Sequence, residues 1–346
     1  AMNSTLPYNA ADVTGASDSD TIALTSVTDG AELTLSGAVE SMSLDVNGAS
    51  RFDILEFDAA TTSVSIDAGA ALRVDDTLTG AGVTTYTVTG AGAVTLTPAL
   101  GTAVTSYAAA NATGAQTILA GATNITITTG SADDVVDMGA TLTSNDTIDL
   151  GAGSNTLRVD IEGLTAGATD LSISNVDTLR LDGINTSGAI QMDNLAIANI
   201  RFDDATAANL DGGVITLTDI ATTSTSFAYT GGGILDDDLF FSPVTVDYDT
   251  TTAIAAATFS ISNGGLVADD MVVGAINANN VTAITINVSE LGQAAADELT
   301  IADVVADNMT DLILTADGAV VFSGIDGDIL DTIDFSAADG DVTAQL

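Results

Sequence analysis

The sequence lacks lysine, histidine, cysteine and tryptophan, four residue types on which much protein chemistry depends. Without histidine or cysteine, the chain cannot build a Ser-His-Asp triad, a cysteine nucleophile, or a conventional zinc or haem site. Without lysine it has no Schiff-base residue and no P-loop. The composition allows a glycosidase-type pair of catalytic carboxylates, but no sequence pattern identifies such a pair among the 48 acidic residues. We therefore expect that the protein is not an enzyme.

Positive charge is also scarce, because five arginines face 48 acidic residues and the formal net charge is −43. Nucleic acids and anionic membranes are bound through basic patches, so we expect neither as a partner. No apolar run reaches the roughly 18 residues of a membrane span, which argues against membrane insertion. Yet 46% of the residues are hydrophobic, a content that is too high for a chain kept disordered by its charge.

The residues that are abundant favour β-structure. Asp greatly outnumbers Glu, Thr and Gly are common, and only three prolines and few aromatic residues occur. Thr favours strands, whereas Asp and Gly favour turns. We therefore expect a β-rich chain with an aliphatic core and many tight turns.

A short apolar pattern recurs along the chain, with apolar residues at its first, fourth and sixth positions. Its fourth position is Met42, Val64 and Tyr86 in three copies that lie 22 residues apart, and Ile284, Leu312 and Ile333 in later ones. Ile125 and Ile148 are further members of the series. Alternating apolar and polar residues are typical of a strand with one buried face. The interval predicts an all-β fold, a β-solenoid or β-helix-like stack with about 20–28 residues per turn; β-sandwich domains are the alternative.

All five arginines belong to the same tripeptide, Arg-apolar-Asp. The five copies are Arg51–Asp53, Arg73–Asp75, Arg158–Asp160, Arg180–Asp182 and Arg201–Asp203. Since residues i and i+2 of a strand share a face, Arg and Asp should point outward and the middle residue inward. Stacked turns would place like charges above one another, so each Arg needs its own Asp and that of a neighbouring turn. We expect a solvated ladder of ion pairs, with a partner-binding stripe as the alternative.

Three nine-residue units follow one another between residues 129 and 158, each with Asp or Asn sixth and an aliphatic residue eighth. They are Thr129–Asp137, Thr141–Asp149 and Leu150–Arg158, and Gly15–Ala23 has the same form. These units resemble the calcium-binding RTX nonapeptide, G-G-x-G-x-D-x-U-x, of secreted bacterial proteins. They depart from it at most glycines, for example at Ala132 and Ser144.

The resemblance implies Ca²⁺ as a cofactor, since Ca²⁺ takes 6–8 oxygen ligands from carboxylates and backbone carbonyls. It implies Asp20, Asp134 and Asp146 as side-chain ligands, Asn155 as a weaker one, and Asp133 as a neighbouring candidate. The other interpretation is that these are Asp-rich solenoid turns closed by Asx hydrogen bonds.

In its composition and its Asn175–Leu181 type of strand, the chain is similar to calcium-dependent bacterial surface-layer proteins of the RTX kind. That similarity implies an extracellular structural protein of the cell surface, exported by type I secretion, which self-assembles into a lattice stabilised by Ca²⁺. Its partners would be further copies of itself and a cell-surface polysaccharide. The alternative is an RTX-type adhesin, or an ice- or glycan-binding solenoid module, for which Thr-x-Thr pairs such as Thr95–Thr97 and Thr126–Thr128 provide candidate ladders.

Two further expectations concern the second half of the chain. The segment Leu291–Asn308 is rich in helix formers and predicts a short helical insertion. Gly231-Gly-Gly233 suggests a break, which divides the chain into a solenoid with RTX-like turns over residues 1–230 and a continuing β-rich segment over 231–346.

Overall fold

In the part of the chain that it describes, the computed structural model consists of β-strands joined by turns and has no α-helix, which confirms the all-β prediction. The residues described are 3–7, 17–121, 124–161, 171–182, 188–192, 195, 197–204, 214–220, 226–231, 239–241, 243–248, 254–262, 270–289, 298–327 and 329–346. The expected helix is wrong where it can be compared: β28 (Glu298–Ile301) and β29 (Val304–Val305) occupy its second part, and residues 291–297 lie outside the described residues. Pairing with strands of neighbouring turns overrides the helix propensity of this segment.

The chain divides into two compact units. Unit 1 comprises Ala1–Arg158 and Leu171–Val176, and unit 2 comprises Val159–Asp170 and Asp177–Leu346. The expected boundary after residue 230 lies within unit 2, directly before Gly231, the last residue of β21 (Ser226–Gly231).

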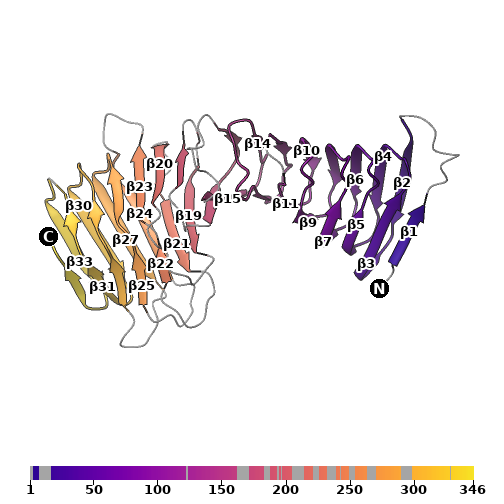
Figure 1. Ribbon diagram of the computed structural model, residues 1–346. Helices are drawn as coiled ribbons and strands as arrows, with labels where there is room; N and C mark the ends of the chain where they lie inside the picture. The colour runs from indigo at the N-terminus through magenta and orange to yellow at the C-terminus, as the bar shows by residue number, and fades with distance from the viewer. Residues whose placement is uncertain are drawn as a thin grey trace. The chain divides into compact units, whose positions relative to one another are not determined.

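Unit 1 is built from two parallel sheets, each of which receives one strand from every turn (Figure 1). Sheet 1 contains β1 (Asn3–Pro7), β3 (Val27–Ser36), β5 (Ser50–Glu56), β7 (Leu72–Thr79), β9 (Val94–Ala99), β11 (Gln116–Leu119), β13 (Val135–Asp137) and the first residues of β15 (Thr156–Asp160). Sheet 2 contains β2 (Ser19–Leu24), β4 (Ser41–Val46), β6 (Ser63–Ala68), β8 (Thr85–Gly90), β10 (Ser106–Ala112), β12 (Thr126–Thr128), β14 (Thr147–Asp149) and β16 (Ser172–Ser174).

Unit 2 has three parallel sheets, which its longer turns supply with a third strand (Figure 1). Sheet 3 contains β17 (Thr178–Asp182), β19 (Asn199–Asp204), β21, β24 (Ala257–Ser262), β27 (Ala283–Ser289), β30 (Asp311–Ala316) and β33 (Thr332–Ala338). Sheet 4 contains β18 (Gly188–Gln191), β20 (Ile215–Ile220), β23 (Val244–Tyr248), β26 (Ile276–Asn279), β29 and β32 (Ile325–Asp326). Sheet 5 contains β22 (Leu239–Phe241), β25 (Asp270–Val273), β28, β31 (Ala319–Phe322) and β34 (Val342–Ala344).

The strand register confirms most of the predicted repeat. Met42 pairs with Val64 and Val64 with Tyr86, and the later markers Ile284, Leu312 and Ile333 are paired in the same way. One marker is wrong, because Ile148 pairs with Ile127 rather than with Ile125. Within the described residues, neighbouring strands pair in parallel, an arrangement that fits a solenoid and excludes the antiparallel sandwich for these strands.

The core is a set of apolar columns that run through the stacked turns. Met42, Val64 and Tyr86 are each at most 2% exposed, and the corresponding side chains of the next turns are buried as well. In unit 2, Phe227 and Phe259 stack with their ring centroids 4.9 Å apart. Since successive strands of the solenoid lie about 4.8 Å apart, each inward side chain contacts its counterpart in the next turn. This repeated burial stabilises a chain that has few aromatic residues and no disulfide.

Candidate functional site

The three sixth-position residues of the RTX-like units lie at the starts of strands in different sheets. Asp134 directly precedes β13 and Asn155 directly precedes β15, both in sheet 1, whereas Asp146 directly precedes β14 in sheet 2. The structure therefore brings Asp134 and Asn155 together and places Asp146 apart from them. Of the remaining candidates, Asp133 lies beside Asp134 and is exposed, and Asp20 is an exposed residue of β2.

The buried candidates accept hydrogen bonds from the backbone of a neighbouring turn. Asp134 Oδ1 accepts from the Gln116 amide at 2.7 Å, and Asp146 Oδ1 accepts from the Ile125 amide at 2.7 Å. Asn155 Oδ1 accepts from the Asp134 amide at 3.0 Å. Each side chain thus ties its own turn to the preceding one, a structural role that accounts for Asp or Asn at this position without a metal.

The second oxygens of these side chains differ in their surroundings. Asp146 Oδ2 accepts from the Thr143 amide at 2.6 Å and from the Thr143 hydroxyl at 3.1 Å. The Asn155 amide group donates to the carbonyls of Leu150 and Asn175 at 2.9 and 3.0 Å. Asp134 Oδ2, by contrast, is buried and has no hydrogen-bond partner within the described residues.

Asp134 is therefore the residue of this set in which a carboxylate is least well accommodated. It is 0% exposed, and burial raises the pKa of its carboxyl, an effect that the nearby Gln116 and Gly130 amides and the Thr129 hydroxyl only partly offset. The Thr129 hydroxyl donates to the Leu150 carbonyl at 2.8 Å. A buried oxygen without a partner is satisfied either by a proton or by a cation.

The candidates fit Ca²⁺ only if backbone oxygens supply most of its ligands. Among the residues that the structure describes, no three acidic side chains are grouped so that they could hold a metal ion. Asp133 and Asp134 are neighbours, but Asp133 Oδ1 already accepts from the Ser154 amide at 2.8 Å. Asp20 Oδ1 likewise accepts from the Thr21 amide at 2.7 Å. A site at Asp134 would depend on the carbonyls of the surrounding turns, as in the motif that the units resemble.

Sequence reasoning missed a second use of aspartate in these units. At the ninth position, Asp137 Oδ1 accepts from the Gly139 amide at 2.8 Å, and Asp149 Oδ1 accepts from the Gly151 amide at 3.1 Å. Both glycines have positive φ, 49° and 66°. The sequence signal for these turns is Asp-x-Gly. The Asp side chain accepts a hydrogen bond from the amide two positions later and closes a turn that favours glycine.

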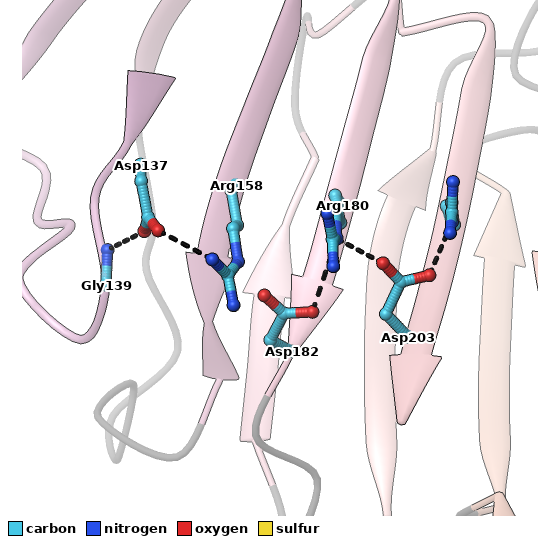
Figure 2. A network of polar contacts seen from close by, with 7 residues as sticks. Asp137, Gly139, Arg158, Arg180, Asp182 and Asp203 are labelled. Carbon is cyan, nitrogen blue, oxygen red and sulfur yellow. Dashed lines mark hydrogen bonds and ion pairs between the residues drawn. The ribbon is translucent and has the colours of Figure 1, made fainter. Parts of the chain in front are cut away.

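The arginines form the ion-pair ladders that the tripeptide predicts. Arg51 and Arg73 occupy paired positions in β5 and β7, and both contact Asp75, in the turn of Arg73. Phe52 and Val74, the middle residues of the two tripeptides, are 1% and 0% exposed, so they point inward as expected. In unit 1, Arg158 also pairs with Asp137 of the preceding turn at 3.0 Å (Figure 2).

The ladder of unit 2 has buried carboxylates. Arg180 pairs with Asp182 at 3.5 Å and with Asp203 of the next turn (Figure 2). Arg201 pairs with the other oxygen of Asp203. The side chains of Asp182 and Asp203 are 7% and 5% exposed, whereas that of Arg180 is 37% exposed. The carboxylates therefore lie deeper than the solvated ladder that we expected, and all five arginines are engaged.

The ladder alters the titration of Asp75. Partial burial by itself raises the pKa of this carboxyl, but the hydrogen bonds and positive charges of Arg51 and Arg73 outweigh it and lower the pKa below the ordinary value. The carboxylate form is therefore the one that the folded state favours.

The two Thr-x-Thr pairs have different surroundings. In sheet 1, Thr97 donates its hydroxyl to the carbonyls of Val74 and Asp75, both at 2.9 Å, and its neighbour Thr95 pairs with Arg73. In sheet 2, Thr126 and Thr128 pair with Ser106 and Ala108, and hydroxyl residues continue through the earlier turns. Only the second pair belongs to an extended column of hydroxyls.

Comparison with known proteins identifies no relative: no protein-family model, no curated protein and no solved structure matches this chain. Within the described residues, no helix has the length and apolar character needed to cross a membrane.

Proposed function

We propose that this chain is a structural protein of the cell surface, an extracellular β-solenoid that assembles with copies of itself into a layer and binds Ca²⁺. The observation that carries the proposal is the use of the five arginines. All of them pair with aspartates of their own unit, so the protein has no further cationic side chain to offset a net charge of −43. Cations from the surroundings must do so, and extracellular calcium is a divalent source.

The solenoid itself suits a structural role. A stack of turns with a continuous core buries its apolar residues without a ligand, and its outer faces are long and regular. Repeated contacts between identical surfaces generate closed or extended assemblies. A cell-surface polysaccharide is the second partner of this proposal, as the attachment of the layer to the cell.

The test compares the purified protein in Ca²⁺ and in EDTA. We expect ordered sheets in electron micrographs and a higher melting temperature in Ca²⁺, and dispersed protein with a lower melting temperature in EDTA. Mg²⁺ at the same concentration serves as the control for ionic screening. Equal melting temperatures and equal assembly states in Ca²⁺ and EDTA would show that the calcium part of the proposal is wrong.

A second candidate function is a binding module that attaches to ice or to a glycan without forming a lattice. The hydroxyl columns of sheet 2 favour it, because a regular array of hydroxyls matches a regular hydrogen-bonding partner. A protein that stays monomeric in Ca²⁺ and binds to ice or to an insoluble polysaccharide would support this candidate over the layer.

A further inference from the structure

The turn that contains β32, β33 and β34 forms one end of the stack in unit 2. Each of these strands is the last member of its sheet, so within the described residues none has a neighbour on its outer side. Ile333 and Phe335 of β33 are half-buried, whereas Leu312 and Leu314 of the preceding strand in sheet 3 are 0% exposed. Four apolar side chains are incompletely covered there, and we call them and the strand edges beside them the open end: Ile329, Ile333, Phe335 and Val342.

β33 supplies the longest free edge of this turn, with seven residues from Thr332 to Ala338. The outer edge of a strand presents main-chain N–H and C=O groups with which another strand can pair. Proteins block such edges with proline or with a charged residue in an inward position. β33 has neither, because it contains no proline and its single charged residue, Asp334, is exposed and pairs with the outward Ile313.

The strands that end the stack in unit 1 are blocked in both of these ways. β1 contains Pro7, which has no main-chain donor. β2 carries Asp20 at the position that pairs with Met42, in the column that continues with the buried Val64 and Tyr86. This end has edges in two sheets, whereas the open end has edges in three. The end formed by β1 and β2 is therefore a poor partner for the open end.

We infer that a second copy of this chain packs on the open end, end to end around a two-fold axis, with the two β33 strands paired antiparallel. An open edge needs an equally open edge as its partner, and the same end of another copy provides one. In a two-fold contact the same surface meets itself, so Ile333 and Phe335 of the two copies face each other across it. The inference goes beyond the proposed function, because it follows from the end of the stack and requires neither calcium nor a layer.

Acidic side chains at the open end oppose this contact at low ionic strength. The turn carries five exposed aspartates and contains no arginine. They are Asp326, Asp331, Asp334, Asp339 and Asp341. The screening length is about 10 Å in 0.1 M salt and about 3 Å in 1 M salt, so added salt removes most of the repulsion and leaves the apolar contact. The inference therefore predicts a dimer that strengthens as the salt concentration rises.

The size of the open end predicts a reversible dimer. A turn of about 21 residues, at roughly 3.3 Å per residue, has a perimeter of about 70 Å and covers, with its outward side chains, roughly 500 Å². The contact would then bury about 1,000 Å² in total, at the lower end of the range for specific interfaces. Main-chain hydrogen bonds between the two β33 strands fix the orientation of the copies, which an apolar contact alone does not.

Single cysteines locate the contact, because the chain contains no cysteine of its own. Ser336→Cys is a small change at an exposed position near the middle of β33, and Thr21→Cys places a thiol on the exposed edge strand β2. In EDTA and about 0.5 M NaCl, we expect a short thiol cross-linker to join two copies of Ser336→Cys. In an equimolar mixture, with a size tag on one variant, products that contain Thr21→Cys should be rare. Mixed products that equal or outnumber the Ser336→Cys dimers would show head-to-tail packing and overturn the inference.

A charge variant tests the same surface by sedimentation in the same buffer. Ile329→Asp removes a 52% exposed apolar side chain and sets like charges against each other, so it should raise the dissociation constant of the dimer at least about tenfold. Val135→Asp is the matched control, because Val135 is also an exposed apolar residue, at 38%, but belongs to unit 1. It should leave the constant unchanged, and both variants should keep the melting temperature of the wild type.

Two sedimentation results would overturn the inference: a wild type that stays monomeric in high salt, or equal dissociation constants for Ile329→Asp and the wild type. Neither result contradicts the proposed layer, which is tested by the difference between Ca²⁺ and EDTA. Conversely, dimers in EDTA without ordered sheets in Ca²⁺ would support the inference and contradict the layer.

Discussion

At the scale of single residues, the turns of this solenoid are held by side chains that serve the backbone of a neighbouring turn. Asp134, Asp146 and Asn155 each accept an amide hydrogen bond that the strands leave open. A metal is not needed for that role, so the sixth-position residues have a structural interpretation beside the calcium one. The partnerless Oδ2 of Asp134 is the atom at which they differ.

Asp134→Asn separates the two interpretations by the sign of its effect. The variant keeps the Oδ1 acceptor and removes a buried carboxylate. Burial raises the pKa of the Asp134 carboxyl, which means that its charged form destabilises the fold. In EDTA at pH 7 we therefore expect a melting temperature equal to or about 2–4 °C above that of the wild type. If Asp134 binds Ca²⁺, the wild type alone should gain stability when Ca²⁺ is added. Thermal unfolding of both proteins with and without Ca²⁺ measures this.

Asp146→Asn is the control for that comparison, since both oxygens of Asp146 already have partners in the protein. Its response to Ca²⁺ should equal that of the wild type. A loss of the calcium response in Asp146→Asn but not in Asp134→Asn would contradict the expectation that any bound Ca²⁺ is held by Asp134 rather than by Asp146.

Gly153 tests how closely the turns stack. It has φ of 118°, and an added Cβ would lie 2.1 Å from the Ala132 carbonyl oxygen of the preceding turn. We expect Gly153→Ala to lower the free energy of unfolding by about 3 kcal/mol, from the strained φ and the displaced backbone together. Gly139→Ala is the matched control, because Gly139 also has positive φ but its Cβ would meet nothing within 4 Å; a loss of about 1 kcal/mol is expected there. Urea unfolding measures both, and equal losses would refute close stacking as the cause.

At the scale of elements, the Arg-apolar-Asp strands couple one turn to the next. Paired strands align like residues, so Arg180 stands beside Arg201, and the carboxylate of Asp203 lies between the two guanidinium groups. The aspartate thereby relieves the repulsion that the register creates. The same arrangement recurs in unit 1, where Asp75 serves Arg51 and Arg73.

A double-mutant cycle measures this coupling. Because Asp203 is buried, we expect a coupling free energy of about 1–2 kcal/mol between Arg180→Ala and Asp203→Ala in urea unfolding. The control cycle, Arg73→Ala with Asp75→Ala, involves a more exposed arginine and should give less than about 1 kcal/mol. A larger coupling in the exposed pair would contradict burial as the source of the difference.

At the scale of the whole molecule, the net charge of −43 adds self-repulsion that opposes the folded state. The charge of −43 at pH 7 falls to zero near the sequence pI of about 4.1, so acidification relieves self-repulsion before it breaks the ladders. The lowered pKa of Asp75 acts in the opposite sense: its ion pairs stabilise the fold above the pKa of an unfolded Asp, and this contribution is lost as the pH falls through the folded value.

We therefore expect a stability maximum on the acidic side of neutrality. In EDTA and at low salt, the melting temperature should rise as the pH falls from 7 to about 5 and decline below about 4. In 0.5 M NaCl the rise should be smaller, because salt screens the repulsion that protonation removes. A melting temperature that falls steadily from pH 7 downward in low salt would contradict net repulsion as the main term.

The sequence by itself determined the strands that carry the recurring apolar pattern, the buried side of most of them, and the phase of the arginine ladder, because alternation and pairing of like turns are local and periodic properties. It did not determine β28 and β29, which lie where a helix was expected. Only the tertiary structure decided that a turn has two sheets in unit 1 and three in unit 2, that Ile127 rather than Ile125 pairs with Ile148, and that Asp134 meets Asn155 but not Asp146. These outcomes depend on how loops of unequal length return each strand to the stack. The stacking of turns, rather than the neighbouring residues in the chain, decides which residue about 21 positions away a side chain contacts.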